Sequence, residues 1–309
     1  MLRRMYRALR EAVPAIERLR ARAAPRLAGP PSRRLDGGVE LVFGGAALRV
    51  FGDPDDAYYA AAAAQMRSQE RVCSVLRACC AERSATPAVA LDIGANIGLA
   101  TLAMATTLPS SARLLAIEPS PRNLSHLRRN LAENGLSRVE VVAAAVGAEP
   151  GSLSFHESHF GAGSHLVSEH HLARASMPAV SVRVETLDSI VAARGLERLD
   201  FIKVDVEGFE PDVLAGGAGA IERFRPVIHM EFNSWTLMAF RNANPRGFLE
   251  DLVRRFPHVL AFGPRGGFEP ITDQGGMLGF LHRNLVERGC VDDLVLCHDM
   301  GWTRGAAPT

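Results

Sequence analysis

Lysine is almost absent from this chain. A single lysine, Lys203, stands among 35 basic residues in a sequence of 309, so arginine supplies nearly every positive charge. The formal net charge is only +1, which gives no global attraction to nucleic acid. Because arginine and lysine are not interchangeable, one compact ammonium in an arginine-rich chain indicates a local chemical requirement at position 203.

Paired cysteines are also missing. The five cysteines form no C-x-x-C pair and show no metal-ligand spacing, and two adjacent cysteines are poorly placed to form a disulfide with each other. We therefore expect reduced thiols and a cytoplasmic protein. The cysteines are Cys73, Cys79, Cys80, Cys290 and Cys297.

Long apolar runs are absent as well. Residues 1–36 are rich in arginine and carry apolar residues at roughly helical spacing, which predicts a basic amphipathic arm followed by the proline-containing linker "AGPPSRR". The arginines interrupt every apolar stretch before it reaches the ~20 residues of a spanning helix, and a signal peptide is not supported either. We expect a solvated helix, with peripheral membrane contact as the alternative.

We expect residues 37–85 to form a small N-terminal cap. The segments "VELVF" and "ALRVF" flank Gly44 and Gly45, which is typical of a hairpin, and an alanine-rich helix is expected over residues 58–80. The cap would precede the main domain.

We expect residues 86–301 to form the main domain, because predicted strands and helices alternate regularly along them. The strands "AVALDIG", "RLLAIEPS" and "VEVVAAAVG" are separated by the helices "GLATLAMATTL" and "PRNLSHLRRNLAENG". Such alternation predicts an α/β domain with a doubly wound, Rossmann-like parallel sheet. Ser120 as N-cap, Pro121 in the first turn and Asn134 with Gly135 at the end delimit the second of these helices.

The first strand of this domain ends in a glycine-bearing turn, "LDIGANIG", which begins at Leu91 and contains Asp92, Gly94, Asn96 and Gly98. The dinucleotide fingerprint places another glycine where the backbone approaches a pyrophosphate, and this turn lacks it. Glu118 closes the next strand, where a carboxylate can accept hydrogen bonds from ribose hydroxyls. A nucleoside cofactor without phosphates fits this pattern, and S-adenosylmethionine is such a cofactor.

The segment "FIKVDVEG", residues 201–208, is anomalous for a buried parallel strand. Lys203, Asp205 and Glu207 alternate with apolar residues, whereas strands covered on both faces are normally apolar throughout. The charges therefore predict a cleft at the carboxyl end of the strand. A buried ammonium needs a partner, and the expected partners are Asp205 and Glu231, the latter near the end of "PVIHMEFN".

These motifs together resemble the FkbM-type S-adenosylmethionine-dependent methyltransferases, which are class I enzymes that mostly O-methylate natural products and glycans. The resemblance covers residues 88–235 and is carried by "LDIGANIGLATL", "AIEPSPRNLSHLRRNLAENG", "FIKVDVEGFEPDVLAGG" and "RPVIHMEF". It implies that Asp92, Gly94, Asn96, Gly98 and Glu118 hold the cofactor and that Ala143 and Ala144 lie near its adenine. It also implies that "KVDVEG" and Glu231 line the reaction cleft, and it leaves the acceptor undefined.

An alcohol that accepts a methyl group must lose its proton, so a base is expected in the cleft. Lys203, Asp205 and Glu231 are the candidates, with Lys203 and Asp205 expected to act together and the choice between them open. No metal is favoured, although Asp205, Glu231 and Asn233 are oxygen donors that could hold Mg²⁺.

Other readings stay open at this point. A nicotinamide-dependent oxidoreductase is disfavoured by the missing glycine, and a non-catalytic protein that binds cofactor or membrane is disfavoured by the intact charged residues. The histidine-rich segment "FHESHFGAGSHLVSEHH", residues 155–171, is expected to be a loop that covers the substrate and not a zinc site, because it lacks recognised ligand spacing. The partner is expected to be a small-molecule or glycan hydroxyl, and the sequence does not indicate an oligomeric state.

Overall fold

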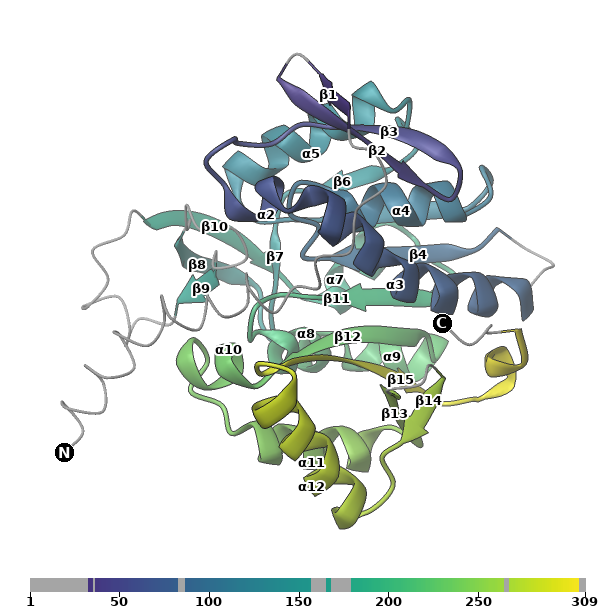
Figure 1. Cartoon of the computed structure of the whole chain (residues 1–309). Coiled ribbons are helices and arrows are strands. Elements are labelled where there is room, and N and C mark those ends of the chain that lie inside the picture. The colour runs from purple at the N-terminus through teal and green to yellow at the C-terminus, as the bar shows by residue number, and fades with distance from the viewer. Residues whose placement is uncertain are drawn as a thin grey trace.

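The computed structural model describes residues 33–35, 37–82, 87–156, 165–167, 179–263 and 267–305. Within them an eight-stranded sheet forms the centre of the molecule (Figure 1). Its strand order is β14-β13-β15-β12-β11-β4-β5-β6. The strands are β4 Val89–Ile93, β5 Arg113–Ile117, β6 Glu140–Val142, β11 Phe201–Val204, β12 Val227–Asn233, β13 His258–Phe262, β14 Phe268–Pro270 and β15 Val291–Cys297.

The sheet is parallel over the strands that the sequence predicts, and it is antiparallel at one edge. Strands β6, β5, β4, β11 and β12 pair in parallel, while β15, β13 and β14 add antiparallel strands beyond β12. The chain runs from β4 through β5 to β6 on one side, then returns to β11 on the other side of β4. The doubly wound, Rossmann-like class is thereby confirmed, and the reversal of strand order lies at β4 and β11.

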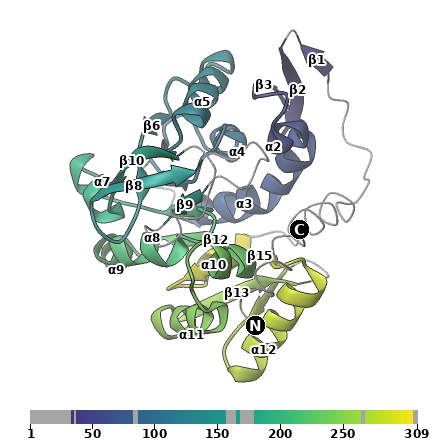
Figure 2. The same cartoon turned by 90° about the vertical axis from the view of Figure 1, so that its left-hand side faces the viewer.

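Helices cover both faces of the sheet (Figure 2). One face packs on helices close to the N-terminus, namely α3 Ala62–Glu82, α4 Leu99–Thr107 and α5 Pro121–Glu133. The opposite face packs on α7 Leu187–Ala193, α8 Glu210–Gly216, α9 Ala218–Phe224, α10 Ser234–Ala239, α11 Pro245–Arg255 and α12 Gln274–His282. The short helices η1 Arg283–Glu287 and η2 Gly301–Gly305 complete the carboxyl-terminal part.

The predicted delimiters of the helix α5 are confirmed. The Ser120 side chain accepts a hydrogen bond from the Asn123 amide, Pro121 is in the first turn, and Asn134 is the C-cap. Gly135 follows with φ +65°, a left-handed conformation that glycine adopts without a Cβ clash.

The N-terminal hairpin is also confirmed. Strands β2 Gly38–Phe43 and β3 Ala46–Val50 pair around Gly44 and Gly45, and β1 Arg33–Leu35 adds a third strand. The expected helix is divided at Ala61 into α2 Ala57–Ala60 and α3. Because α3 belongs to the same hydrophobic cluster as the main sheet, cap and sheet share one core. The boundary at residues 85 and 86 stays a prediction.

The expectation of a single strand at residues 139–147 is wrong, because part of this segment belongs to a second, four-stranded sheet. That segment divides into β6 and β7 Ala145–Val146, because the Ala144 amide donates to the carbonyl of Val142 and bends the chain. Strand β7 then leaves the main sheet and joins a small one of order β7-β10-β8-β9. Its other strands are β8 Gly151–His156, β9 His165–Val167 and β10 Ala179–Glu185.

Candidate active site

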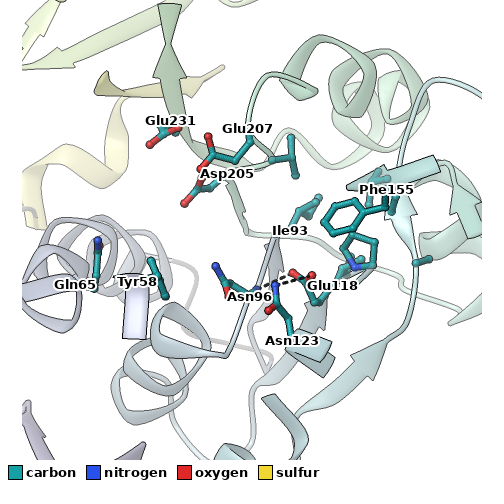
Figure 3. A pocket seen from close by; sticks show the side chains of 17 residues that line it. Tyr58, Gln65, Ile93, Asn96, Glu118, Asn123, Phe155, Asp205, Glu207 and Glu231 are labelled. Carbon is teal, nitrogen blue, oxygen red and sulfur yellow. Dashed lines mark hydrogen bonds between the residues drawn. The ribbon is translucent and has the colours of Figure 1, made fainter. Parts of the chain in front are cut away.

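A pocket lies at the carboxyl ends of β4, β5, β11 and β12, beside the point where the strand order reverses (Figure 3). This is the place where doubly wound sheets bind ligands. Residues from the turns after these strands, from β7 and β8, and from the N-terminal helices line it. They are Tyr58, Gln65, Ile93, Gly94, Asn96, Ile117, Glu118, Pro119, Asn123, Ala144, Ala145, Val146, Phe155, Asp205, Val206, Glu207 and Glu231.

The turn after β4 needs glycine at its first position. Gly94 has φ +84°, and a Cβ there would lie 1.8 Å from the carbonyl oxygen of Asp205. Gly98 has φ +96°, and its Cβ would lie 2.7 Å from the Leu127 side chain. Both glycines therefore permit close packing between segments of the protein. Gly94 lets the segment after β11 approach the turn, and Gly98 lets α5 approach it.

Glu118 joins the ends of β4 and β5. Its Oε2 accepts the Asn96 amide at 2.8 Å, and its Oε1 accepts the Ser120 amide at 2.9 Å and the Asn123 side-chain amide at 3.3 Å. The side chain is 4% exposed. Burial raises the pKa of Glu118 to about 7, although these hydrogen bonds oppose the increase. The bonds fix the carboxylate toward the pocket and leave Oε2 with acceptor capacity.

Lys203 lies between two carboxylates beneath the pocket. Its Nζ is 3.2 Å from Asp205 Oδ2 and 3.4 Å from Asp92 Oδ1. Asp92 is fully buried, and its other oxygen accepts a 2.6 Å hydrogen bond from Thr101. Burial alone would lower the pKa of Lys203, but Asp205 and Asp92 raise it above its ordinary value. The ammonium is therefore held in its charged form.

The prediction for the lysine's partners is right for Asp205 and wrong for Glu231. Lys203 is paired across the sheet with Asp92 on β4 and with His229 on β12. On β12 the residue opposite Lys203 is His229, and Glu231 lies two residues farther along that strand. On β4 the residue opposite Lys203 is Asp92, which contacts the ammonium. Predicting this contact requires the register of β4 against β11, which one sequence does not supply.

The expected alternation through Glu207 is also corrected, because β11 ends at Val204. The Glu210 carboxylate accepts the amides of Val206 and Gly208, both at 3.2 Å, and forms a turn in which Glu207 has φ +52°. Asp205 and Glu207 therefore reach the pocket from a turn. Lys203, inside the strand, does not line it.

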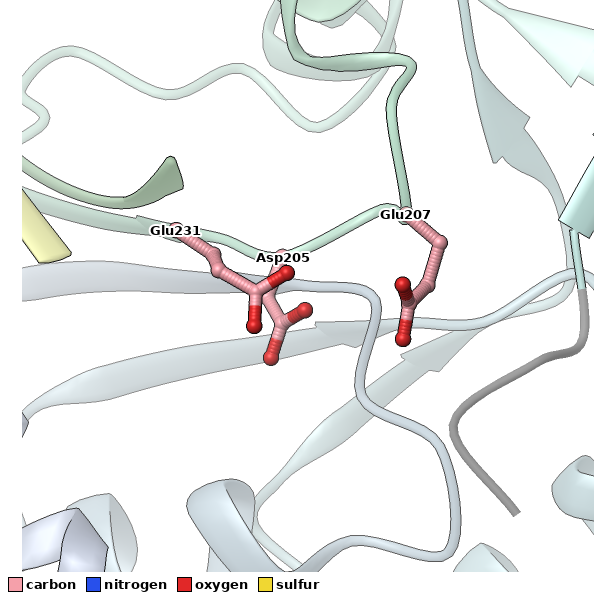
Figure 4. Close-up of side chains that lie close together, drawn as sticks. All are labelled: Asp205, Glu207 and Glu231. Atoms are coloured by element: carbon pink, nitrogen blue, oxygen red, sulfur yellow. The ribbon is translucent and has the colours of Figure 1, made fainter. Parts of the chain in front are cut away.

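Three carboxylates meet at this end of the pocket (Figure 4). Oxygens of Asp205, Glu207 and Glu231 all lie within 4.8 Å of one another. Burial and the charge of Asp205 raise the pKa of Glu231 well above its ordinary value. In the alternative magnesium set, Asn233 uses its Oδ1 to cap α10, and its amide donates to Glu231 at 3.2 Å. Magnesium binding by Asp205, Glu231 and Asn233 stays a prediction.

The other predicted cofactor residues have different positions relative to the pocket. Gly94, Asn96, Glu118 and Ala144 line it, whereas Asp92 and Gly98 support the turn from beneath. Ala143 is exposed and does not line the pocket, because the bend before β7 turns it outward.

Sequence reasoning missed several lining residues. Tyr58 and Gln65 come from α2 and α3, Asn123 from the first turn of α5, and Phe155 from β8. Only Asn123 carried a usable signal, since it follows Glu118 within the same motif. The others are brought to the pocket by contacts between segments distant in sequence.

Parts of two other predictions lie outside the described residues. His159, His170 and His171 fall there, and no side-chain geometry is described for His156 or His165, so zinc binding and a covering loop stay untested. The arm up to residue 32 lies outside them too. Within the described ranges, no helix is long and apolar enough to cross a membrane. Cytoplasmic location and peripheral membrane contact stay predictions.

Comparison with known families identifies one match. Residues 92–269, more than half of the chain, match the family described as the methyltransferase FkbM domain. The 2-O-methyltransferase NoeI of Sinorhizobium fredii is 32% identical over 193 residues, which cover 58% of this chain and 75% of NoeI.

Two further comparisons have lower sequence identity. The hexuronic acid methyltransferase AglP of Haloferax volcanii is 28% identical over 138 residues, covering 44% of this chain and 53% of AglP. The crystal structure of the O-methyltransferase TomG from Streptomyces achromogenes, in complex with SAM, aligns with a TM-score of 0.41 and 16% identity. That alignment covers 77% of this chain and 81% of TomG.

Proposed function

Because the chain belongs to the FkbM methyltransferase family and is an S-adenosylmethionine-dependent methyltransferase, we propose that it methylates a hydroxyl oxygen of a sugar, glycan or natural product. NoeI is named as a 2-O-methyltransferase and AglP as a hexuronic acid methyltransferase, which supports a sugar as the acceptor. The nicotinamide-dependent and non-catalytic alternatives are not retained.

The charge of the pocket is the observation that carries the proposal. Its charged lining residues in the described part of the chain are all acidic, namely Glu118, Asp205, Glu207 and Glu231. A pyrophosphate would meet four acidic side chains there, Asp205 and Glu207 among them, and no lysine or arginine side chain. A cationic sulfonium is favoured by the same surroundings, so the residues fit S-adenosylmethionine better than a dinucleotide.

We propose that Glu118 holds the ribose hydroxyls and that the backbone from Gly94 to Asn96 borders the rest of the cofactor. Ala144, Ala145 and Val146 form the apolar side of the pocket near Glu118 and would border the adenine. Asp92 and Gly98 act from beneath, through Thr101 and through close packing on α5.

Asp205 is the proposed proton acceptor, and Lys203 is a positioning residue. The raised pKa of Lys203 disfavours its acting as the base, and its ammonium holds one oxygen of Asp205 at 3.2 Å. The other oxygen can then receive the proton of the acceptor hydroxyl. Glu231, whose pKa is raised, is suited to remain protonated and to donate a hydrogen bond nearby.

The bound cofactor supplies an electrophilic methyl group on a positively charged sulfur. The acceptor oxygen would gain this methyl group, and the electron pair of the carbon–sulfur bond would stay with sulfur. Asp205 takes the hydroxyl proton, so charge balances without a further reactant. The protein's main task is to hold the acceptor in line with the methyl group.

The test combines binding and turnover. Calorimetry should show that the purified chain binds S-adenosylmethionine and S-adenosylhomocysteine but not NAD. Incubation with methyl-labelled cofactor and a panel of methyl hexosides and methyl hexuronides should yield a labelled methyl ether, detected by mass spectrometry. Asp205→Asn should lower turnover by ~10² or more while leaving cofactor binding intact. Cofactor binding without methylation of any glycoside would overturn the sugar assignment.

A further inference from the structure

The pocket has a wall that the family domain does not supply. Tyr58 and Gln65 line it from α2 and α3, before the matched residues 92–269 begin. In Figure 3 these two side chains lie together on one side, while Glu118 and Phe155 lie on the other. The carboxylates of Asp205 and Glu231 face the space between them. The wall is therefore at the end of the pocket remote from the proposed ribose site.

This N-terminal segment is fastened to the turn that borders the cofactor. The fully buried Asn130 of α5 accepts the Phe51 amide at 2.7 Å and donates to the Phe51 carbonyl at 2.9 Å. The same amide donates to the carbonyl of Ile97 at 2.8 Å. The buried Asn130 side chain thus fixes the end of β3 relative to the glycine turn. The segment that carries the wall is therefore attached to the folded core.

The start of α2 sets which tyrosine faces the pocket. Asp56 caps the helix by accepting the Tyr58 and Tyr59 amides at 2.8 and 3.4 Å. The ring of Tyr59 lies over Gly52, where a Cβ would approach it to 2.5 Å, and its hydroxyl donates to the Val50 carbonyl at 3.5 Å. With Tyr59 packed against the hairpin, Tyr58 is the one that lines the pocket.

The wall offers groups suited to a sugar. Within the described part of the chain, neither the Tyr58 hydroxyl nor the Gln65 side-chain amide makes a hydrogen bond, so both retain capacity for a ligand. Burial raises the pKa of Tyr58 above its ordinary value despite the opposing charge of Lys203, which keeps the phenol protonated and able to donate. Its ring also provides an apolar face beside a polar tip.

We propose that Tyr58 and Gln65 form the acceptor-binding wall and determine which hydroxyl of the acceptor reaches Asp205. The proposal rests on the proposed function, since it takes the acceptor to be a glycoside. Tyr58 and Gln65 are specificity-determining residues in this scheme, and the chemical step stays with Asp205.

The first experiment compares Tyr58→Phe and Gln65→Ala with Tyr59→Phe as the matched control. Tyr59→Phe removes a hydroxyl from the same helix that donates to the Val50 carbonyl at 3.5 Å, outside the pocket. With methyl hexosides and methyl hexuronides as acceptors, we expect each pocket variant to raise the acceptor KM about threefold to tenfold, as loss of one neutral hydrogen bond would. We also expect a changed ratio of methylated positions. The Kd for S-adenosylhomocysteine should stay within twofold, and Tyr59→Phe should match the wild type.

A second experiment does not depend on knowing the acceptor. In Gln65→Cys, the new thiol is alkylated with iodoacetamide and followed by peptide mass spectrometry, with and without S-adenosylhomocysteine. Unchanged alkylation with the cofactor product supports the wall. Protection by the product alone would assign this side of the pocket to the cofactor and overturn the proposal.

The two proposals fail in different ways. If the wild type methylates no glycoside, the sugar assignment is wrong, and the alkylation result still decides where the wall lies. If the wild type methylates glycosides but Tyr58→Phe and Gln65→Ala keep its KM and product pattern, the wall proposal is wrong and the function stands.

Discussion

Cofactor binding should depend on pH through Glu118. Burial raises the pKa of this carboxyl to about 7 in the free protein, and the ionised form is the one that accepts a hydrogen bond from the ribose best. At pH 6 only about one molecule in eleven would carry the ionised form, and at pH 8 about ten in eleven. Because the apparent Kd is the intrinsic Kd divided by the competent fraction, it should fall about tenfold from pH 6 to pH 8.

Calorimetry with S-adenosylhomocysteine tests this dependence. Titrations at pH 6 in buffers of different ionisation enthalpy should show the release of nearly one proton per ligand bound, because binding favours the ionised carboxyl. Glu118→Gln is the matched control: it keeps an acceptor oxygen, cannot titrate, and should bind about tenfold or more weakly at pH 8 with a flatter pH profile. Equal pH slopes in the two proteins would place the titrating group elsewhere, and equal affinities at pH 8 would remove Glu118 from the ribose site.

Three further predictions concern the charged groups around the pocket. Lys203→Arg should lower turnover by ~10² or more, almost as much as Lys203→Met. The reason is that a planar guanidinium cannot replace an ammonium held between two carboxylates. Near-normal turnover of the arginine variant would refute a specific role for lysine. Glu210→Gln should become more stable relative to wild type as pH rises from about 4.5 to 7. The raised folded pKa of Glu210, about 7, makes wild-type stability decrease across that window by at most about 3 kcal/mol, and melting curves at pH 5 and 8 measure the difference. Turnover should persist in EDTA, since Lys203 already faces Asp205 and the pKa of Glu231 is raised; a tenfold loss restored by Mg²⁺ would show a metal site.

The sequence predicts the frame of the molecule well, because its signals are local. Strand β4, the glycine turn and helix α5 each carry their own apolar pattern, caps or glycines, so a few neighbouring residues predict the position of each. The position of Glu118 at the end of β5 follows from the same pattern. The sequence does not predict structure that depends on contacts with distant segments. At Ala144, for example, the amide bonds the Val142 carbonyl, the chain bends, and the next strand joins a second sheet.

The candidate site shows the same division. Charges within apolar strands predict Lys203, Asp205 and Glu231, but the partner Asp92 depends on the pairing of two strands more than a hundred residues apart. Tyr58 and Gln65 gave no signal, since an aromatic residue and an amide in an alanine-rich helix are compatible with ordinary packing. Their place in the pocket depends on how the N-terminal segment packs on the sheet, and that packing includes the contacts of Asn130 with Phe51, which cannot be deduced from spacing.

The proposed base is positioned by the pairing of β4 with β11. The Asp205 amide donates to the Ile93 carbonyl at 3.0 Å, its own carbonyl occupies the space that a Cβ on Gly94 would need, and its carboxylate is held by Lys203. Asp205 is therefore fixed to β4 and the proposed cofactor-binding turn through its backbone, and to β11 through its side chain. A change that moves the turn must also move Asp205, so cofactor and proton acceptor keep their relative geometry, which in-line transfer requires.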